Sequence, residues 1–81
     1  MKEYVVLFFT HSGAITFKRK LEKQGIQYEL MPVPRKLSSN CGISAKIQYE
    51  HSTTYLLDQN VESVYLVQNG EYIRIYKDEI M

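Results

Sequence analysis

The sequence predicts a small α+β protein of the ferredoxin-like class, a β-α-β-β-α-β sandwich with an added C-terminal hairpin strand. A continuous apolar run over residues 4–9 is typical of a strand buried on both faces. Apolar residues at helical spacing follow it. Strict alternation over residues 43–49 and a later Asn-Gly pair are typical of antiparallel strands. Together these patterns predict two helices on one face of an antiparallel sheet.

The first half of the chain predicts one helix between two strands. Thr10 or Ser12 can cap the helix, apolar side chains at positions 14, 17 and 21 share one of its faces, and Gly25 suits the position after its last turn. A second strand follows, in which apolar and polar residues alternate until Pro32 ends it.

The second half predicts a strand, a short helix and a hairpin. In residues 43–49 the apolar side chains fall on one face and the polar ones on the other. Ser52 can cap a helix that runs to about Gln59 and buries Tyr55 and Leu56. A strand over residues 64–68 then leads into the Asn69-Gly70 turn. In the returning strand over 71–76, alternation places Ile73 and Ile75 on one face and Tyr72, Arg74 and Tyr76 on the other.

The predicted topology brings several chain segments to one end of the sheet. A right-handed crossover places the first two strands parallel, and the third fills the gap between them, antiparallel to both. Thr10 and His11 end the first strand there, residues 32–35 end the second, and Cys41 and Gly42 precede the third. The N-terminus of the first helix starts at the same end.

Length and composition exclude several classes of protein. Residues 1–81 predict a single domain, near the lower limit of chains that fold alone. Ten basic and nine acidic residues nearly cancel, so neither nucleic acid nor a membrane is an expected partner. The N-terminal apolar stretch is too short to span a membrane and lacks a cleavage site for secretion. We therefore expect a cytoplasmic protein whose thiol stays reduced.

The stretch PRKLSSNCG at residues 34–42 contains the only cysteine, Cys41. A thiol must ionise to act as a nucleophile, and positive potential favours the thiolate. The helix N-terminus, Arg35 and Lys36, and His11 if protonated, could supply that potential. A lone cysteine can equally be a buried structural thiol. The candidate site is therefore Cys41 as nucleophile with anion-binding residues around it, namely Arg35, His11, Ser12, Ser38, Ser39 and Gly42, in a loop shaped by Pro32 and Pro34.

No cofactor or metal site is expected from the residues. His11, His51 and Cys41 could in principle bind a metal ion, but they lack the paired spacing of known metal sites. We expect no cofactor and no metal.

These residues also resemble a known family. THS at 10–12, GI at 25–26 and above all PVPR…SSNCG at 32–42 resemble the DUF3343 family of selenium or sulfur carrier-like proteins. The resemblance covers roughly residues 4–49. It implies that Cys41 holds sulfur or selenium as a persulfide or selenosulfide, with Ser38, Ser39, Gly42, Pro34 and Arg35 completing the motif. Asn40, where a small residue is usual, and Lys18, near a usual acidic position, depart from the pattern and bear on the choice of partner.

Two functions from different classes remain open at this point. The first is a carrier that a donor enzyme such as a cysteine desulfurase loads and an acceptor enzyme unloads. The second is a non-catalytic ferredoxin-like interaction or regulatory module, in which Arg35, Lys36 and the loop amides bind a small anion and Cys41 is incidental. In an extended segment after Pro34, Arg35 and Lys36 would point to opposite sides, and the guanidinium would be the better anion ligand. Cys41→Ser discriminates between the two functions, because only the carrier requires the sulfur.

Overall fold

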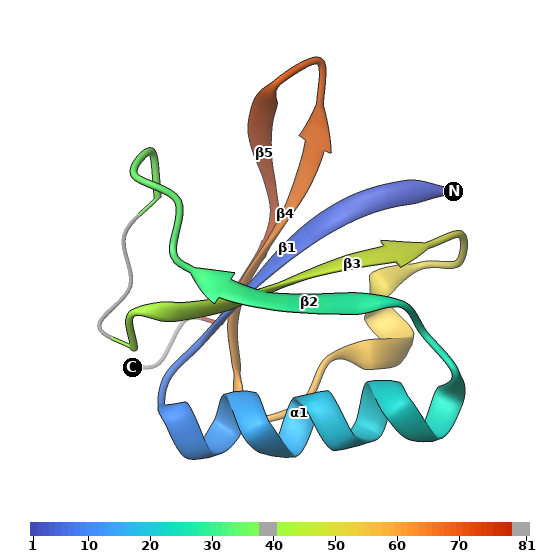
Figure 1. Cartoon of the computed structure of the whole chain (residues 1–81). Coiled ribbons are helices and arrows are strands. Elements are labelled where there is room, and N and C mark those ends of the chain that lie inside the picture. Colours follow the sequence, from blue (N-terminus) through green and yellow to red (C-terminus); the bar gives the residue numbers. More distant parts are fainter. Residues whose placement is uncertain (38–40, 79–81) are drawn as a thin grey trace.

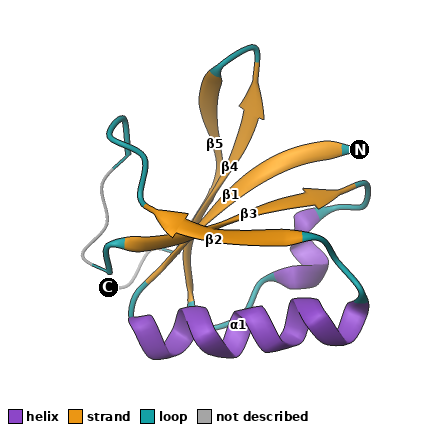
Figure 2. Cartoon of the chain, in the orientation of Figure 1, coloured by secondary structure: helices purple, strands orange, loops and turns teal. Residues whose placement is uncertain are grey.

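A computed structural model of the chain describes residues 1–37 and 41–78. Figures 1 and 2 show a sheet with one long helix below it. The elements in chain order are β1 (Lys2–Phe8), α1 (His11–Gln24), β2 (Tyr28–Pro32), β3 (Ile43–Tyr49), the 3-10 helix η1 (Thr53–Leu56), β4 (Val61–Gln68) and β5 (Glu71–Lys77).

The sheet has the strand order β2-β3-β1-β4-β5, and each neighbouring pair is antiparallel. β3 therefore lies between β1 and β2, which run parallel to each other, as the crossover argument predicts. β5 extends the sheet as the added hairpin strand. The predicted α+β class is confirmed, and the topology is compatible with a ferredoxin-like fold.

The predicted ends of α1 are confirmed. The Thr10 hydroxyl oxygen accepts a hydrogen bond from the Gly13 N–H at 2.9 Å, which satisfies one of the unpaired amides of the first turn. Gly25 closes the helix with its N–H directed to the Glu22 and Leu21 carbonyls. Within the described residues, no helix has the length and apolar character needed to cross a bilayer.

The core lies between α1 and the sheet. The Phe8 and Phe17 rings meet there with centroids 5.2 Å apart, which joins β1 to the middle of α1. Burial of these apolar faces is the main stabilising term of the fold. The buried cluster comprises Tyr4, Val6, Phe8, Ala14, Phe17, Leu21, Ala45, Ile47, Leu56, Val61 and Val64.

The second predicted helix is wrong in length and in part of its burial. The segment forms only the single 3-10 turn η1, in which Leu56 is buried as predicted but Tyr55 is 75% exposed. Two adjacent β-branched threonines begin the segment and disfavour a longer helix. The Asp58 carboxylate then accepts the Asn60 N–H at 2.8 Å, a local turn that competes with helix continuation.

Lys20 joins this short segment to α1. Its ammonium group donates to the Leu56 carbonyl at 2.8 Å and to the Asp58 carboxylate at 3.2 Å. The lysine thus holds the connection after η1 against α1 through one carbonyl and one carboxylate.

The Asn69-Gly70 hairpin is confirmed. Both residues have positive φ, 52° and 78°, as a type I′ turn requires. β4 begins at Val61, three residues earlier than the sequence pattern indicates.

The predicted faces of β5 are wrong for one tyrosine. Arg74 lies opposite Tyr65, but Tyr76 lies opposite Val64, so Ile75 is an extra residue in a β-bulge. The bulge shifts the alternation by one residue. Tyr76 consequently packs against the core on the helix side instead of sharing a face with Arg74.

Candidate functional site

The ends of three strands and the start of α1 meet at one end of the sheet. Pro32, the last residue of β2, lies opposite Ile43, the first residue of β3. Leu7, near the end of β1, lies opposite Ser44 of β3. Figure 1 shows the start of α1 and the start of β3 on the same side of the view. The segments that the sequence predicts to converge therefore do converge.

The loop between β2 and β3 is closed at its base. The Val33 N–H donates to the Gly42 carbonyl oxygen at 3.4 Å, which continues the strand pairing by one residue. The Leu37 N–H donates to the Pro34 carbonyl at 2.9 Å. This bond forms a turn that carries the basic pair of the loop at its two central positions.

Arg35 and Lys36 are both exposed in that turn. The predicted extended segment after Pro34 is therefore wrong, because the chain reverses there. The half-buried Pro34 begins the turn, whereas Pro32 is exposed at the end of β2. Both charges face solvent and remain available to an anion. Ser38, Ser39 and Asn40, which belong to the predicted motif, lie outside the described residues.

Cys41 is half-buried and packs against the helix-side core, two residues before β3. Gly42 follows it, exposed and with φ 77°. A Cβ atom at Gly42 would meet nothing within 4 Å. Glycine is needed there because of the backbone conformation, not because of crowding around the sulfur. The thiol is thus held between the core and the loop.

His11 and Ser12 form the first turn of α1, and both are exposed. No acidic residue occupies this turn, so no carboxylate of the turn offsets the partial positive charge of the helix end. The Thr10 hydroxyl occupies the Gly13 amide. The amides of His11 and Ser12 have no partner in the described part of the chain and are available to an anion.

Ser44 is a positioning residue that the sequence pattern does not single out. It is fully buried, and its hydroxyl donates to the Met31 carbonyl at 3.2 Å, with the Pro32 carbonyl at 3.4 Å. This contact joins the start of β3 to the end of β2, next to the loop that bears Cys41. The only sign of this role in the sequence is that Ser44 is a small polar residue on the polar face of the alternating strand.

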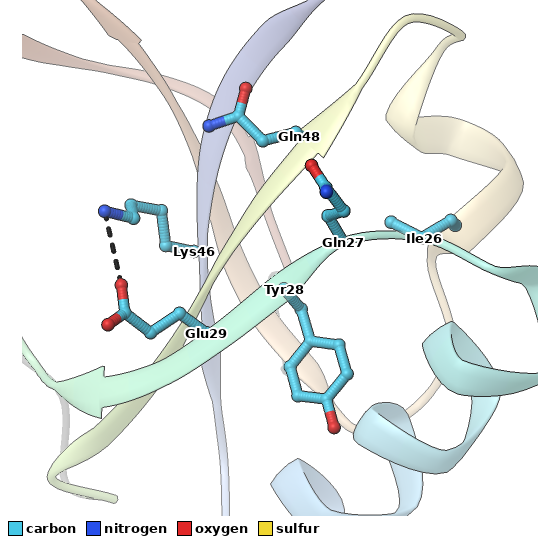
Figure 3. Close-up of a pocket in the computed structure, with 6 residues that line it drawn as sticks. All are labelled: Ile26, Gln27, Tyr28, Glu29, Lys46 and Gln48. Atoms are coloured by element: carbon cyan, nitrogen blue, oxygen red, sulfur yellow. Dashed lines mark ion pairs between the residues drawn. The ribbon is translucent and has the colours of Figure 1, made fainter.

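A groove of about 550 Å³ lies elsewhere, along the open edge at the start of β2. Figure 3 shows Tyr28 directed towards α1, and the ion pair between Glu29 and Lys46 on the other side of the strand. The groove contains no residue of the predicted site, and no cysteine, serine or threonine lines it. It is lined by Ile26, Gln27, Tyr28, Glu29, Lys46 and Gln48.

His51 is not grouped with Cys41 as metal ligands would be. Cys41 precedes β3 and His51 follows it, so the strand separates them, and the His51 ring packs on Tyr49 with centroids 5.5 Å apart. Within residues 1–37 and 41–78, no three His, Cys, Asp or Glu side chains converge.

The fold and the site define a small α+β domain with one cysteine at the entrance to its third strand. Residues 3–68 match the family described as "Putative Se/S carrier protein-like". The chain belongs to this family, which confirms the resemblance inferred from the motif.

A relative is the Escherichia coli (strain K12) protein described as "Uncharacterized protein YtiA". It is 26% identical over 72 residues, which cover 86% of this chain and 85% of the relative. No solved structure shows significant similarity to the chain.

Proposed function

We propose that the protein carries sulfur or selenium on Cys41 between a donor enzyme and an acceptor enzyme. The observation that carries the proposal is the position of Cys41 in a chain of this family. The thiol lies in the connection into β3, at the end of the sheet where α1 begins and where the loop is basic. The family description supports transfer of sulfur or selenium as the chemistry. The position of Cys41 supports its sulfur atom as the one that bears the transferred atom.

The proposed loading step is a transfer without net oxidation. The Cys41 thiolate attacks the outer sulfur of a donor persulfide, and a new S–S bond forms as the donor's own S–S bond breaks. The donor cysteine leaves as a thiolate and takes up a proton, and Cys41 then bears the persulfide. An acceptor thiolate attacks the outer sulfur in the same way and releases Cys41. With selenium the outer atom is Se, and the product is a selenosulfide.

Two groups at this end of the sheet are suited to stabilise the anionic forms. The first turn of α1 offers the amides of His11 and Ser12 together with the helix dipole. The turn at Arg35 and Lys36 adds two exposed cations. No acidic residue in the first turn of α1 offsets the partial positive charge of the helix end. A thiolate and a persulfide anion would both gain from this potential.

The expected partners are a sulfur- or selenium-donating enzyme, such as a cysteine desulfurase, and an acceptor enzyme. The proposal includes a cytoplasmic location, where thiols remain reduced between transfers. It requires neither nucleic acid nor a membrane. The carrier itself would not turn over a substrate and would need no cofactor.

Intact-mass measurement after incubation with a cysteine desulfurase and cysteine tests the proposal. We expect a gain of one sulfur atom that a thiol reductant removes. Cys41→Ser should show no gain, and His51→Ala, a change at the opposite end of β3, should load normally. If the wild-type protein gains no mass while a known acceptor in the same assay does, the sulfur-carrier function is contradicted. A gain that persists in Cys41→Ser would place the sulfur elsewhere and contradict the assigned residue.

A further inference from the structure

The outer side of α1 carries a row of exposed side chains along most of its length. Figure 1 shows α1 below the sheet, so this side of the helix faces away from the rest of the fold. The opposite side is buried and comprises Gly13, Ala14, Phe17 and Leu21. Residues three or four apart in a helix lie one above the other. The outer row consists of four exposed residues at this spacing, namely Ser12, Ile15, Arg19 and Lys23.

Two cations of the outer row have no acidic partner. The sequence of α1, HSGAITFKRKLEKQ, has four basic residues and one acidic residue. The ammonium group of Lys20 is held by the connection after η1, and the carboxylate of Glu22 accepts the Tyr28 hydroxyl. Within residues 1–37 and 41–78, Arg19 and Lys23 form no ion pair. Their charges are therefore available to a second molecule.

The composition of the outer row is unfavourable for an isolated helix. Arg19 and Lys23 are four residues apart, and like charges at this spacing destabilise a helix. Ile15, one turn before Arg19, is 41% exposed and leaves apolar surface in water. Carboxylates and an apolar contact from a second molecule would turn both features into favourable ones.

A hollow beside the outer row suits a carboxylate side chain. Its volume is about 500 Å³. Among the described residues that line it, three are cationic and none is acidic. The lining consists of Thr16, Arg19, Lys20, Lys23 and Gln24.

The outer row has the character of a protein interface. An apolar contact beside arginine, with charged residues at the rim, is typical of the surfaces through which proteins bind each other. Nucleic acid is bound by a larger excess of positive charge, whereas ten basic and nine acidic residues nearly cancel in this chain. The complementary surface is therefore an acidic protein surface with an apolar contact for Ile15.

The outer row begins at the end of the molecule that bears Cys41. Ser12 lies in the first turn of α1, at the end of the sheet where the loop into β3 carries the thiol. The 14 residues of α1 span about 21 Å. A protein that covers the first half of the outer row therefore also reaches the Cys41 end of the sheet.

We propose that a cysteine desulfurase docks on the outer row of α1 when it loads Cys41. The docking enzyme presents carboxylates to Arg19 and Lys23 around an apolar contact for Ile15. This inference rests on the proposed carrier function and adds to it the surface and the charge of the loading partner.

Sulfur transfer from a cysteine desulfurase, measured at increasing concentrations of the full chain, tests the proposal. Arg19→Glu and Lys23→Glu should each raise the KM for this protein by about fivefold with kcat unchanged, because the charges act on association. Ile15→Ser should also raise KM. Added NaCl should raise the KM of the wild type more than that of the double variant Arg19→Glu with Lys23→Glu.

Matched controls separate docking from a general effect of charge or folding. Arg74→Glu in β5 and Lys2→Glu in β1 make the same charge changes at exposed positions away from α1 and should leave KM unchanged. Arg19→Glu also replaces the like-charge pair in α1 with an attractive one, so the helix should be no less stable. Thermal melts followed by circular dichroism check this.

Calorimetric titration of the protein with the desulfurase, without cysteine, measures docking apart from transfer. If the wild type loads and the α1 variants keep its KM, the docking surface is contradicted while the sulfur-carrier function is supported. Binding that the α1 variants lose, without any loading of the wild type, contradicts the sulfur-carrier function and supports the docking surface. Absence of both binding and loading contradicts both. An equal rise in KM for the α1 variants and the controls contradicts a specific surface. Binding of a single-stranded RNA that the α1 variants abolish would identify a nucleic-acid surface instead.

Discussion

Val33 and Gly42 close the loop that carries Cys41, since the Val33 N–H donates to the Gly42 carbonyl oxygen at 3.4 Å. Gly42 accepts this bond with φ 77°, a conformation that L side chains rarely adopt. The position of the thiol therefore depends on Gly42. A side chain there would meet no neighbouring atom, but the left-handed backbone conformation favours glycine.

Gly42→Ala should destabilise the protein for this reason. We expect the free energy of unfolding to fall by about 1–2 kcal/mol, the cost of the left-handed conformation for a residue with a Cβ atom. Denaturant unfolding measures it. Gly42→Asn is the matched control and should lose less, because asparagine tolerates this region. If Gly42→Ala is as stable as the wild-type protein, residue 42 is not held at positive φ.

A second prediction compares the hairpin turn with the cysteine. Gly70→Val should lower the free energy of unfolding by about 1–2 kcal/mol, because a β-branched residue at positive φ is strained. Cys41→Ser should lower it less, because the thiol is only half-buried. Parallel urea melts of the two variants test the order. The reverse order would identify Cys41 as a core residue whose main role is packing.

The first helix and the hairpin turn could be predicted because their signals are local and agree with each other, whereas the strand order followed from the crossover rule. The Thr10 cap, the apolar face of α1 and the Asn69-Gly70 turn each specify their own geometry. The length of the second helix could not be predicted from the Ser52 cap alone. Its continuation depended on the Asp58 side chain, which contacts both Asn60 and Lys20.

The bulge at Ile75 had no signal in the alternating pattern. Glycine often marks a bulge, but here an isoleucine is the extra residue, so the pattern EYIRIYK reads as a regular strand. Tyr76 was consequently placed on the wrong face. The correct face follows only from the pairing with Val64, which is a tertiary contact.

The convergence at the Cys41 end of the sheet followed from topology, which fixes where strand ends meet. The conformation of the loop did not follow. A proline before two basic residues is compatible with an extended segment and with a turn, and the Leu37 to Pro34 hydrogen bond shows the turn. Ser44 was missed because its role depends on carbonyls of the neighbouring strand.

The contact between Tyr28 and Glu22 leads to a pH prediction. The Tyr28 hydroxyl donates to the Glu22 carboxylate at 2.7 Å. The pKa of Tyr28 is raised above its ordinary value of 10.0, mainly by this hydrogen bond. Desolvation and the negative charge of Glu22 act in the same direction. Ionised Tyr28 would lose the bond and face a carboxylate. The contribution to stability is therefore complete below the unfolded pKa and is lost as pH rises through the folded pKa.

Spectrophotometric titration of tyrosinate tests this prediction. Tyr28→Phe should remove a component that titrates above the ordinary tyrosine range, and Glu22→Gln should move that component to lower pH. The stability difference between the wild type and Tyr28→Phe should shrink above about pH 10. Tyr72→Phe in β5 is the control and should leave the component in place. If the titration that Tyr28→Phe removes lies at or below the ordinary tyrosine range, the contact between Tyr28 and Glu22 does not persist in solution.

The last prediction concerns the division of roles between Arg35 and Lys36, and it depends on the proposed carrier function. Both side chains are exposed at the centre of the same turn, so position alone does not favour either. Their chemistry does. The guanidinium offers several donors in a rigid planar fork, whereas the ammonium is a strongly hydrated point charge. A persulfide anion on Cys41 should therefore depend more on Arg35.

Arg35→Ala should shorten the lifetime of the loaded protein severalfold, because the outer sulfur loses a fixed donor and reacts sooner with stray thiols. Lys36→Ala should change the lifetime little. Decay of the mass-shifted species in a fixed concentration of glutathione measures both variants. Arg35→Lys keeps the charge without the fork and should fall between wild type and Arg35→Ala. Equal lifetimes for the two alanine variants would mean that the loop acts only through its total charge. Arg35 would then be an ordinary solvent-exposed residue with no specific role.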